Sequence, residues 1–231
     1  MIEIRTNIKS VKNLTQLGGF LRLSGISLVL FAETHGLLSE TEVQKEIIKN
    51  VHFDSFLYEL LEDKKLTNRI DKEKLLNEPD NKDFSIISKF RDLKPTVLLS
   101  KEFDIPLIGC DFKNTGRENT DFRENKELTK EEQEQEDNFL IKREKKQLKV
   151  IKDYTKSGSV FASIGAYHLR PGSYLISHIK DNFIVIFPVF KDGELFGRRE
   201  NFNEEDLFYN IFEKKNFKMK KIKLDCKDKS K

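Results

Sequence analysis

Features that would place the chain in a membrane, a secretory route or a disulfide-rich class are missing from this sequence. It contains two cysteines, Cys110 and Cys226, which form neither a CxxC metal motif nor a disulfide framework. The longest apolar stretch, residues 26–32, is far too short to span a bilayer. The first ten residues, MIEIRTNIKS, lack the apolar segment of a signal peptide. We therefore expect a cytoplasmic protein without membrane spans, with specialised secretion as the other route left open.

An excess of charge of one sign is also missing. The 231 residues include 42 basic and 39 acidic side chains, for a net charge of +3. So even a balance does not indicate a nucleic-acid-binding protein, which concentrates basic residues on one surface. Apolar residues make up 37% of the chain and phenylalanine alone accounts for 19 positions, which is enough material for a core. We expect a single domain over residues 1–231, with a central portion at about 26–189 and a lysine-rich tail at about 214–231.

Short apolar segments recur along the whole chain and predict strands. They are residues 26–32, 55–61, 105–110, 160–166, 183–189 and, as an alternating edge strand, 218–224. Helical patterns lie between them, at residues 39–50, 64–76, 83–93, 127–156, 174–180 and 203–212. Ser39 with Glu42 forms the pattern of a capping box. The alternation predicts an α/β fold, a three-layer sandwich whose central, largely parallel mixed sheet is flanked by helices.

Polar residues at the ends of these strands are the candidates for a functional site, because ligands of open α/β sheets bind beyond the carboxyl ends of parallel strands. The first strand runs into Glu33 and His35, which share a face in extended backbone. They suit acid–base chemistry or metal binding, or else lie in a charged surface loop. Glu59 lies inside the apolar segment FLYELL. It needs a partner if buried, or else it lies at the solvated tip of the strand.

The later strands and the long helix add further candidates. Asp111 follows the third strand and either points into the same crevice or starts a turn. Tyr167 and His168 follow the strand 160–166, just before a helix whose first N–H groups suit an anion or oxyanion. Arg143 interrupts the apolar face of the helix 127–156, where a buried guanidinium needs carboxylates such as those of Glu33 or Glu59. The alternative is that it reaches solvent at the helix edge.

Four motifs in this order resemble those of the superfamily that links erythromycin esterases, haem-binding ChaN-type lipoproteins, TraB/Tiki proteins and part of a Pasteurella toxin. The motifs are Glu33-Thr34-His35-Gly36, Glu59 in a strand, Arg143 on a long helix, and Gly165-Ala166-Tyr167-His168 followed by Gly172. The resemblance covers roughly residues 26–180. It implies an α/β fold in which these residues converge on one pocket, but it does not fix the reaction, since members hydrolyse lactones, act as metal-dependent peptidases or bind haem.

The first functional hypothesis is a hydrolase of an ester or of a peptide or amide bond. His35 would be the general base on water, oriented by Glu33 or Glu59, and His168 would orient substrate or stabilise its charge. Arg143 would hold the carboxylates or bind the developing oxyanion. In a variant of this hypothesis a divalent metal (Zn²⁺, Mn²⁺ or Fe²⁺) is bound by His35, His168, Glu33 or Glu59. Asp111 and Tyr167 are then candidates for binding a small-molecule or peptide substrate.

Two other classes of function stay open. A non-catalytic protein could bind haem through Tyr167 or His168, which ranks lower because the many phenylalanines are explained by an apolar core. A toxin or effector domain acting on a host molecule is the third hypothesis. The sequence contains no feature that predicts an oligomeric state.

Overall fold

One mixed sheet organises the chain. The computed structural model describes residues 2–6, 26–33, 38–77, 90–113, 129–170, 172–180, 183–189 and 220–224. The strands in these ranges form an eight-stranded sheet of order β4-β5-β3-β6-β2-β7-β1-β8. Their bounds are β1 Ile2–Thr6, β2 Leu28–Glu33, β3 Ser55–Tyr58, β4 Lys65–Leu66, β5 Leu107–Gly109, β6 Val160–Gly165, β7 Phe183–Val189 and β8 Lys220–Leu224.

The centre of the sheet is parallel and its edges are antiparallel. Parallel pairing joins β5 to β3, β3 to β6, β6 to β2 and β2 to β7. Antiparallel pairing adds β4 at one edge, and β1 and then β8 at the other. The carboxyl ends of the parallel strands therefore share one edge of the sheet, which is where open α/β sheets bind ligands.

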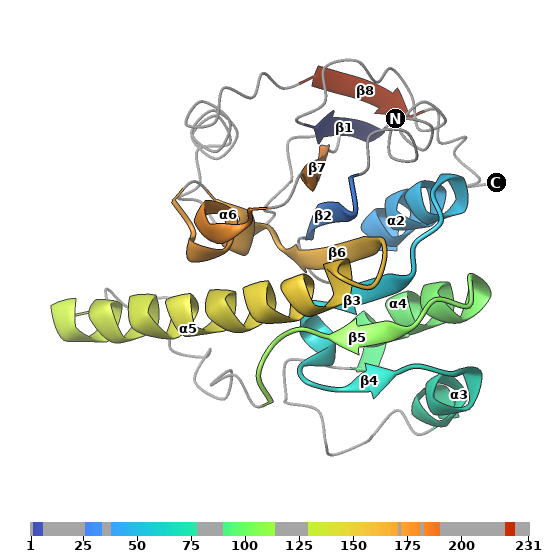
Figure 1. Cartoon of the computed structure of the whole chain (residues 1–231), viewed down its shortest axis with the longest axis horizontal. Helices are drawn as coiled ribbons and strands as arrows, with labels where there is room; N and C mark the ends of the chain where they lie inside the picture. Colours follow the sequence, from blue (N-terminus) through green and yellow to red (C-terminus); the bar gives the residue numbers. More distant parts are fainter. Residues whose placement is uncertain are drawn as a thin grey trace.

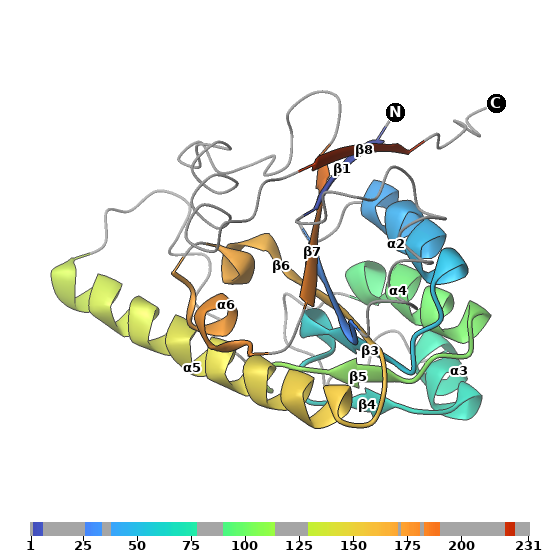
Figure 2. The same cartoon turned by 45° about the horizontal axis from the view of Figure 1, so that its top comes forward.

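Helices cover both faces of the sheet, as Figures 1 and 2 show. One face carries α2 (Leu38–Asn50), α3 (Arg69–Asn77) and α4 (Phe90–Glu102). The other carries the long helix α5 (Lys130–Thr155) and the short α6 (Tyr174–His178). Two 3₁₀ turns, η1 (Glu59–Leu61) and η3 (Ala166–Leu169), follow β3 and β6 directly. The predicted three-layer α/β fold with a largely parallel sheet is thus confirmed.

The strands read as continuous apolar runs because both of their faces are buried. In β2, Val29 and Phe31 join the core beneath α2 and α4. Leu28, Leu30 and Ala32 join a second core beneath α5 and α6. Alternation along one strand therefore serves two cores, and a register slip of one residue would exchange them.

The structure also corrects several local expectations. All six predicted strands are present, but β1 and the two-residue β4 were not expected. The strand predicted at 55–61 ends at Tyr58, and Glu59 opens η1. The helix expected at 83–93 is α4, which runs from Phe90 to Glu102 through Pro95. Ser39 lies inside α2, which begins at Leu38, so it is not the cap before the helix. The helix expected at 203–212 lies outside the described residues.

Within the described ranges, no helix combines the length and the apolar character that a membrane span requires. The longest helix, α5, carries charged residues throughout its sequence.

Candidate functional site

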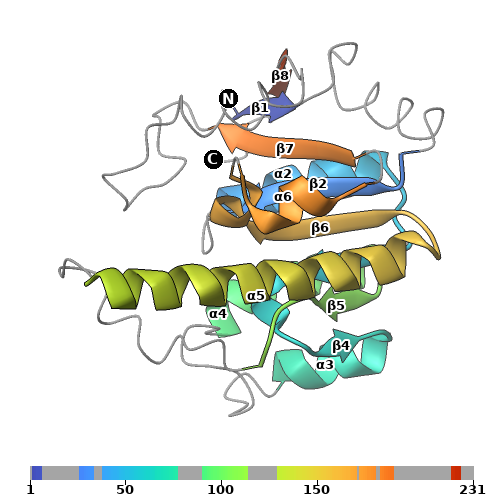
Figure 3. The ribbon, with the colours of Figure 1, turned by 60° about the vertical axis from the view of Figure 1, so that its left-hand side comes forward.

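The predicted polar residues converge on the carboxyl edge of three neighbouring strands. Glu33 is the last residue of β2, Glu59 follows β3, and His168 lies in the turn η3 that follows β6. Because β3, β6 and β2 are adjacent and parallel, these residues leave the sheet at the same edge. Figure 3 shows α5 running alongside these strands, which brings its central turns to that edge. His35, which completes the first motif, lies outside the described residues.

Arg143 joins two buried carboxylates. Its Nη2 group donates to Glu59 Oε1 at 2.5 Å and to Asp111 Oδ2 at 2.5 Å, and its Nε group donates to Asp111 Oδ2 at 2.8 Å. Burial alone lowers the pKa of Arg143, but the negative charges of Glu59 and Asp111 outweigh burial and raise it. A guanidinium is charged at any accessible pH, so Arg143 places one positive charge between the two buried carboxylates. Arg143 therefore faces the core, and its predicted pairing with Glu59 is present.

Glu59 links this ion pair to His168. Its second oxygen accepts a hydrogen bond from the backbone N–H of Gly165 at 2.6 Å. Its first oxygen lies 3.4 Å from Nε2 of His168. Glu59 is 2% exposed, so its carboxylate is not at a solvated tip of the strand but is buried beside its partners.

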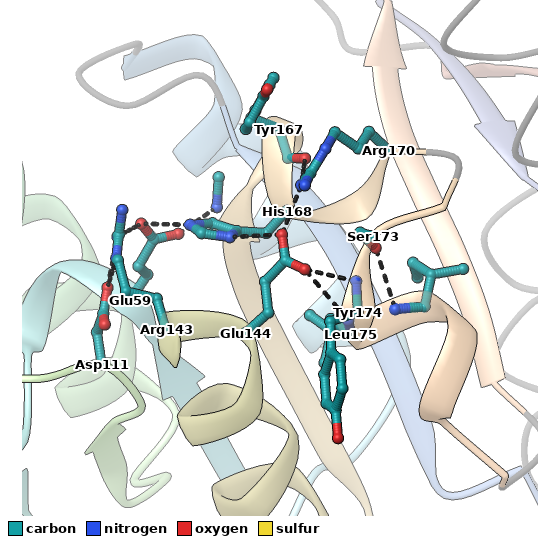
Figure 4. A network of polar contacts seen from close by, with 12 residues as sticks. Glu59, Asp111, Arg143, Glu144, Tyr167, His168, Arg170, Ser173, Tyr174 and Leu175 are labelled. Carbon is teal, nitrogen blue, oxygen red and sulfur yellow. Dashed lines mark hydrogen bonds and ion pairs between the residues drawn. The ribbon is translucent and has the colours of Figure 1, made fainter. Parts of the chain in front are cut away.

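His168 lies between two carboxylates, as Figure 4 shows. Nε2 faces Glu59 and Nδ1 faces Glu144, each at 3.4 Å. A carboxylate only accepts, so a hydrogen bond on both sides needs a proton on both ring nitrogens, which is the imidazolium. Burial by itself lowers the pKa of His168, but the charge of Glu59 and the hydrogen bonds to Glu144 and Glu59 outweigh burial and raise it. The geometry therefore favours a charged His168.

Glu144 is the centre of the second half of the network, and the sequence motifs did not single it out. Oε1 accepts from Arg170 Nη1 at 2.5 Å, while Oε2 accepts from the backbone N–H groups of Tyr174 at 2.6 Å and Leu175 at 3.4 Å. Burial alone raises the pKa of Glu144, but the hydrogen bonds with His168 and Arg170 outweigh it and lower the pKa.

These contacts overturn one expectation about α6. The first N–H groups of that helix seemed suited to an external anion, but those of Tyr174 and Leu175 donate to Glu144 instead. The next, of Ile176, donates to the hydroxyl of Ser173, the residue that caps α6. Gly172 precedes this cap with a φ of +72°, a conformation that favours glycine.

Two consecutive residues of α5, Arg143 and Glu144, therefore act on opposite sides of the His168 ring. Arg143 holds Glu59 against Nε2, and Glu144 faces Nδ1 directly. The sequence contains one signal for Glu144, which lies at helical spacing from the apolar residues Leu148 and Ile151. In the structure all three are buried.

Glu33 belongs to a separate polar cluster on the face that α2 covers. Its carboxylate accepts from the hydroxyls of Tyr58 at 3.0 Å and Ser163 at 2.5 Å. The Ser163 hydroxyl in turn accepts from Gln44 Nε2 at 3.1 Å. Arg143 contacts Glu59 and Asp111, and Glu33 is bound by these hydroxyls instead. The two clusters are neighbours across the sheet, because Glu33 of β2 pairs with Gly165 of β6.

The two residues proposed to contact substrate occupy different positions. Asp111 is fully buried beneath Arg143. Tyr167 is partly exposed, and the guanidinium of Arg170 lies 4.4 Å from the centre of its ring. Arg170 also donates to the backbone carbonyl of Tyr167 at 3.0 Å. Tyr167 is therefore the better placed of the two to meet a molecule that approaches from solvent.

The metal-binding variant finds no ligand set among the described residues, where no group of three or more His, Cys, Asp or Glu side chains could hold an ion. Both ring nitrogens of His168 face carboxylates, and Arg143 already neutralises Glu59. Glu33 is engaged in the other cluster. Among the described candidates, His168, Glu59 and Glu33 therefore do not form a metal site, and His35, the fourth candidate ligand, lies outside the described residues.

Comparisons of the chain with models of known protein families, with curated proteins and with solved structures gave no match.

Proposed function

We propose that this chain is a hydrolase of ester or amide bonds whose site lies at the carboxyl edge of β2, β3 and β6. The observation that carries the proposal is His168, held between Glu59 and Glu144 with both ring nitrogens facing carboxylates. Titratable groups with perturbed pKa values cluster at active sites, and open α/β sheets bind ligands at this edge. The motif resemblance, which includes esterases and peptidases, supports the same reaction class.

In this proposal His168 supplies positive charge and a proton rather than acting as a base. Each N···O separation of 3.4 Å lies beyond the usual 2.7–3.2 Å range of protein hydrogen bonds, so the ring is charged but loosely held. A substrate carbonyl oxygen can therefore share a ring N–H as negative charge develops on it. Stabilising such an oxyanion in a site that excludes water is often the largest single contribution to catalysis.

His35 is the proposed general base. It follows Glu33 by two residues, and Glu33 pairs in register with Gly165, three residues before His168. His35 takes a proton from water while the water oxygen adds to the carbonyl carbon and the C=O electron pair moves onto oxygen. Collapse of the tetrahedral intermediate re-forms the carbonyl and expels the alcohol or amine, which takes a proton from a histidine.

The haem-binding hypothesis receives no comparable support. A histidine that ligates haem needs a free ring nitrogen, and both nitrogens of His168 are directed at carboxylates. The other candidate ligand, Tyr167, has the guanidinium of Arg170 packed over its ring. Nor does any contact in the described part of the chain favour a toxin or effector activity over hydrolysis.

The test is a panel of ester and amide substrates, assayed with the purified chain and with His168→Gln and His35→Gln variants. We expect each substitution to lower kcat by roughly 10²–10⁴-fold, the usual effect of losing an acid–base group. His52→Gln is the matched control, because His52 precedes β3 at the opposite edge of the sheet and its side chain is 86% exposed. It should leave kcat unchanged.

Two additions sharpen this panel. Activity that needs the imidazolium should decline as pH rises through the raised pKa of His168. Assays with and without Mn²⁺, Co²⁺ or Zn²⁺, alongside metal analysis of protein purified without chelator, separate the metal-free reaction from the metal-dependent one. Cleavage that His168→Gln leaves intact would refute the role given to His168, and an inactive wild-type chain across the panel would count against hydrolysis.

A further inference from the structure

The charges of the site are segregated by depth. The side chains of Asp111, Glu59 and Glu144 are 0%, 2% and 0% exposed. The side chains of Arg143 and Arg170, which pair with them, are 13% and 21% exposed. A molecule that approaches the site therefore meets guanidinium groups, with the carboxylates behind them.

Both arginines have N–H groups that donate to no acceptor in the described part of the chain. Arg143 uses Nε and Nη2, and Nη1 has no acceptor within the described part of the chain. Arg170 uses Nη1 for Glu144 and for the Tyr167 carbonyl, and its Nε and Nη2 groups likewise have no acceptor among the described residues. A guanidinium carries five N–H donors, and at these partly exposed side chains the remaining N–H groups are available to a ligand that approaches from solvent.

The surrounding surface has the same sign. Residues 142–146 of α5 read Lys-Arg-Glu-Lys-Lys, and the single acid among them, Glu144, is fully buried. Lys145 lies 5.1 Å from the ring centre of Tyr174, on the α6 side of the site. Lys146 lies 5.8 Å from the ring centre of Phe112, on the Asp111 side. The turn of α5 that borders the site therefore presents only cationic side chains to solvent.

We propose that the substrate carries an oxyanion, a carboxylate or a phosphate, which binds the unused N–H groups of Arg170 and Arg143. This inference rests on the proposed function, since it places the bond to be cleaved at His168. Figure 4 shows Arg143 and Arg170 on opposite sides of His168. Arginine is the side chain best suited to carboxylates and phosphates, because its planar fork donates two parallel hydrogen bonds. Arg170 is the main anchor, because it is the more exposed of the two.

The first experiment measures binding without catalysis. The full chain is titrated with glutarate and, separately, with inorganic phosphate, using calorimetry and amide NMR shifts. We expect saturable binding of at least one anion, weakened roughly tenfold to a hundredfold by Arg170→Gln, as the loss of charged hydrogen bonds implies. Arg170→Lys should retain part of the affinity. Comparing the two anions decides between the planar carboxylate and the tetrahedral phosphate.

Arg69→Gln is the matched control, because Arg69 lies on α3 beneath the other face of the sheet and pairs with Glu73. It should leave both titrations unchanged. The amides of Tyr174 and Leu175, which bind Glu144, report by hydrogen exchange whether α6 stays folded in the Arg170 variants. If Arg170→Gln disturbs α6, the anion affinity of Arg170→Lys decides whether Arg170 binds the anion.

The second experiment compares two esters with the same scissile bond. One bears a free carboxylate, and in the other this carboxylate is replaced by a neutral carboxamide. We expect kcat/KM to favour the anionic ester, and the preference to shrink in Arg170→Gln. Equal kcat/KM for the two esters, or anion binding that no Arg170 variant changes, would overturn the inference. If no substrate is cleaved, the hydrolase proposal fails, while the titrations still decide whether an oxyanion binds at Arg170.

Discussion

Arg143 offers the sharpest test of the site, because one guanidinium satisfies two carboxylates that are shielded from water. Substitution with methionine keeps apolar volume and removes the charge. Glu59 then keeps the N–H of Gly165 and the contact with His168, but Asp111 loses its cationic partner. Breaking a buried pair by removing one member costs about 3–5 kcal/mol, since it leaves an uncompensated buried charge. We expect Arg143→Met to lower the free energy of unfolding by that amount.

A double-mutant cycle separates this pairing from lost packing. Asp111→Asn removes the charge that Arg143→Met strands, so the double variant should recover part of the loss, with a coupling energy of about 1–3 kcal/mol. The measurement is urea unfolding followed by circular dichroism. Arg69→Met, which breaks an exposed pair on α3, should produce no measurable change. A cost for Arg143→Met below about 0.5 kcal/mol, typical of surface positions, would show that Arg143 is solvated and would refute the reasoning.

Further predictions concern the pH dependence of stability, the close packing at Gly109 and the contact between Glu144 and His168. The raised pKa of His168 contributes stability that is complete below its ordinary value of 6.5 and is lost as pH rises through the raised pKa. The lowered pKa of Glu144 contributes stability that is present above its ordinary value of 4.5 and is lost as pH falls through the lowered pKa. Urea unfolding between pH 4 and pH 9 should therefore find greatest stability between those values, and the decline at alkaline pH should vanish in His168→Gln. Gly109→Ala should cost about 1–3 kcal/mol in the same assay, because an added Cβ would overlap the backbone of Glu62. Gly172→Asn should cost less, since nothing crowds that position and asparagine tolerates its positive φ. Equal costs at the two glycines would contradict the close approach at Gly109. Glu144→Gln should lower the pKa of His168, measured by ¹⁵N NMR of the ring, and an unchanged titration would show that Glu144 does not hold the imidazolium.

Much of the fold could be predicted because the central strands bury both faces and so appear as apolar runs in the sequence. The edge strands could not, since β1 (IEIRT) mixes charged and apolar residues and β4 has two residues. The helix predicted to end at residue 93 instead runs through Pro95 to Glu102. Leu93, Val97 and Ser100 nevertheless form a buried stripe at helical spacing, so packing against the sheet outweighs the lost hydrogen bond.

The site was predictable where a motif residue lies at a strand end, as with Glu59 and His168. Arg143 was found because its charge interrupts an apolar helical face. Glu144 was missed because its partners, Arg170 and the amides of α6, are distant in sequence and backbone groups leave no trace in a motif. Tyr58 and Ser163 could not be predicted as partners of Glu33, because they lie inside apolar strands and contact it only once β2, β3 and β6 are aligned.

The parallel pairing of β2 and β6 also has a consequence for how the chain folds. The hydrogen bond between Glu33 and Ser163 joins residues 130 positions apart, and that between Glu59 and Gly165 spans 106 positions. Contacts this distant in sequence require the closure of long loops before any of them contributes stability, which makes folding slow. The ion pairs of the site form only once β2, β3 and β6 are in register. Recovery of the site during refolding should therefore coincide with the last and slowest phase, when the parallel sheet is complete.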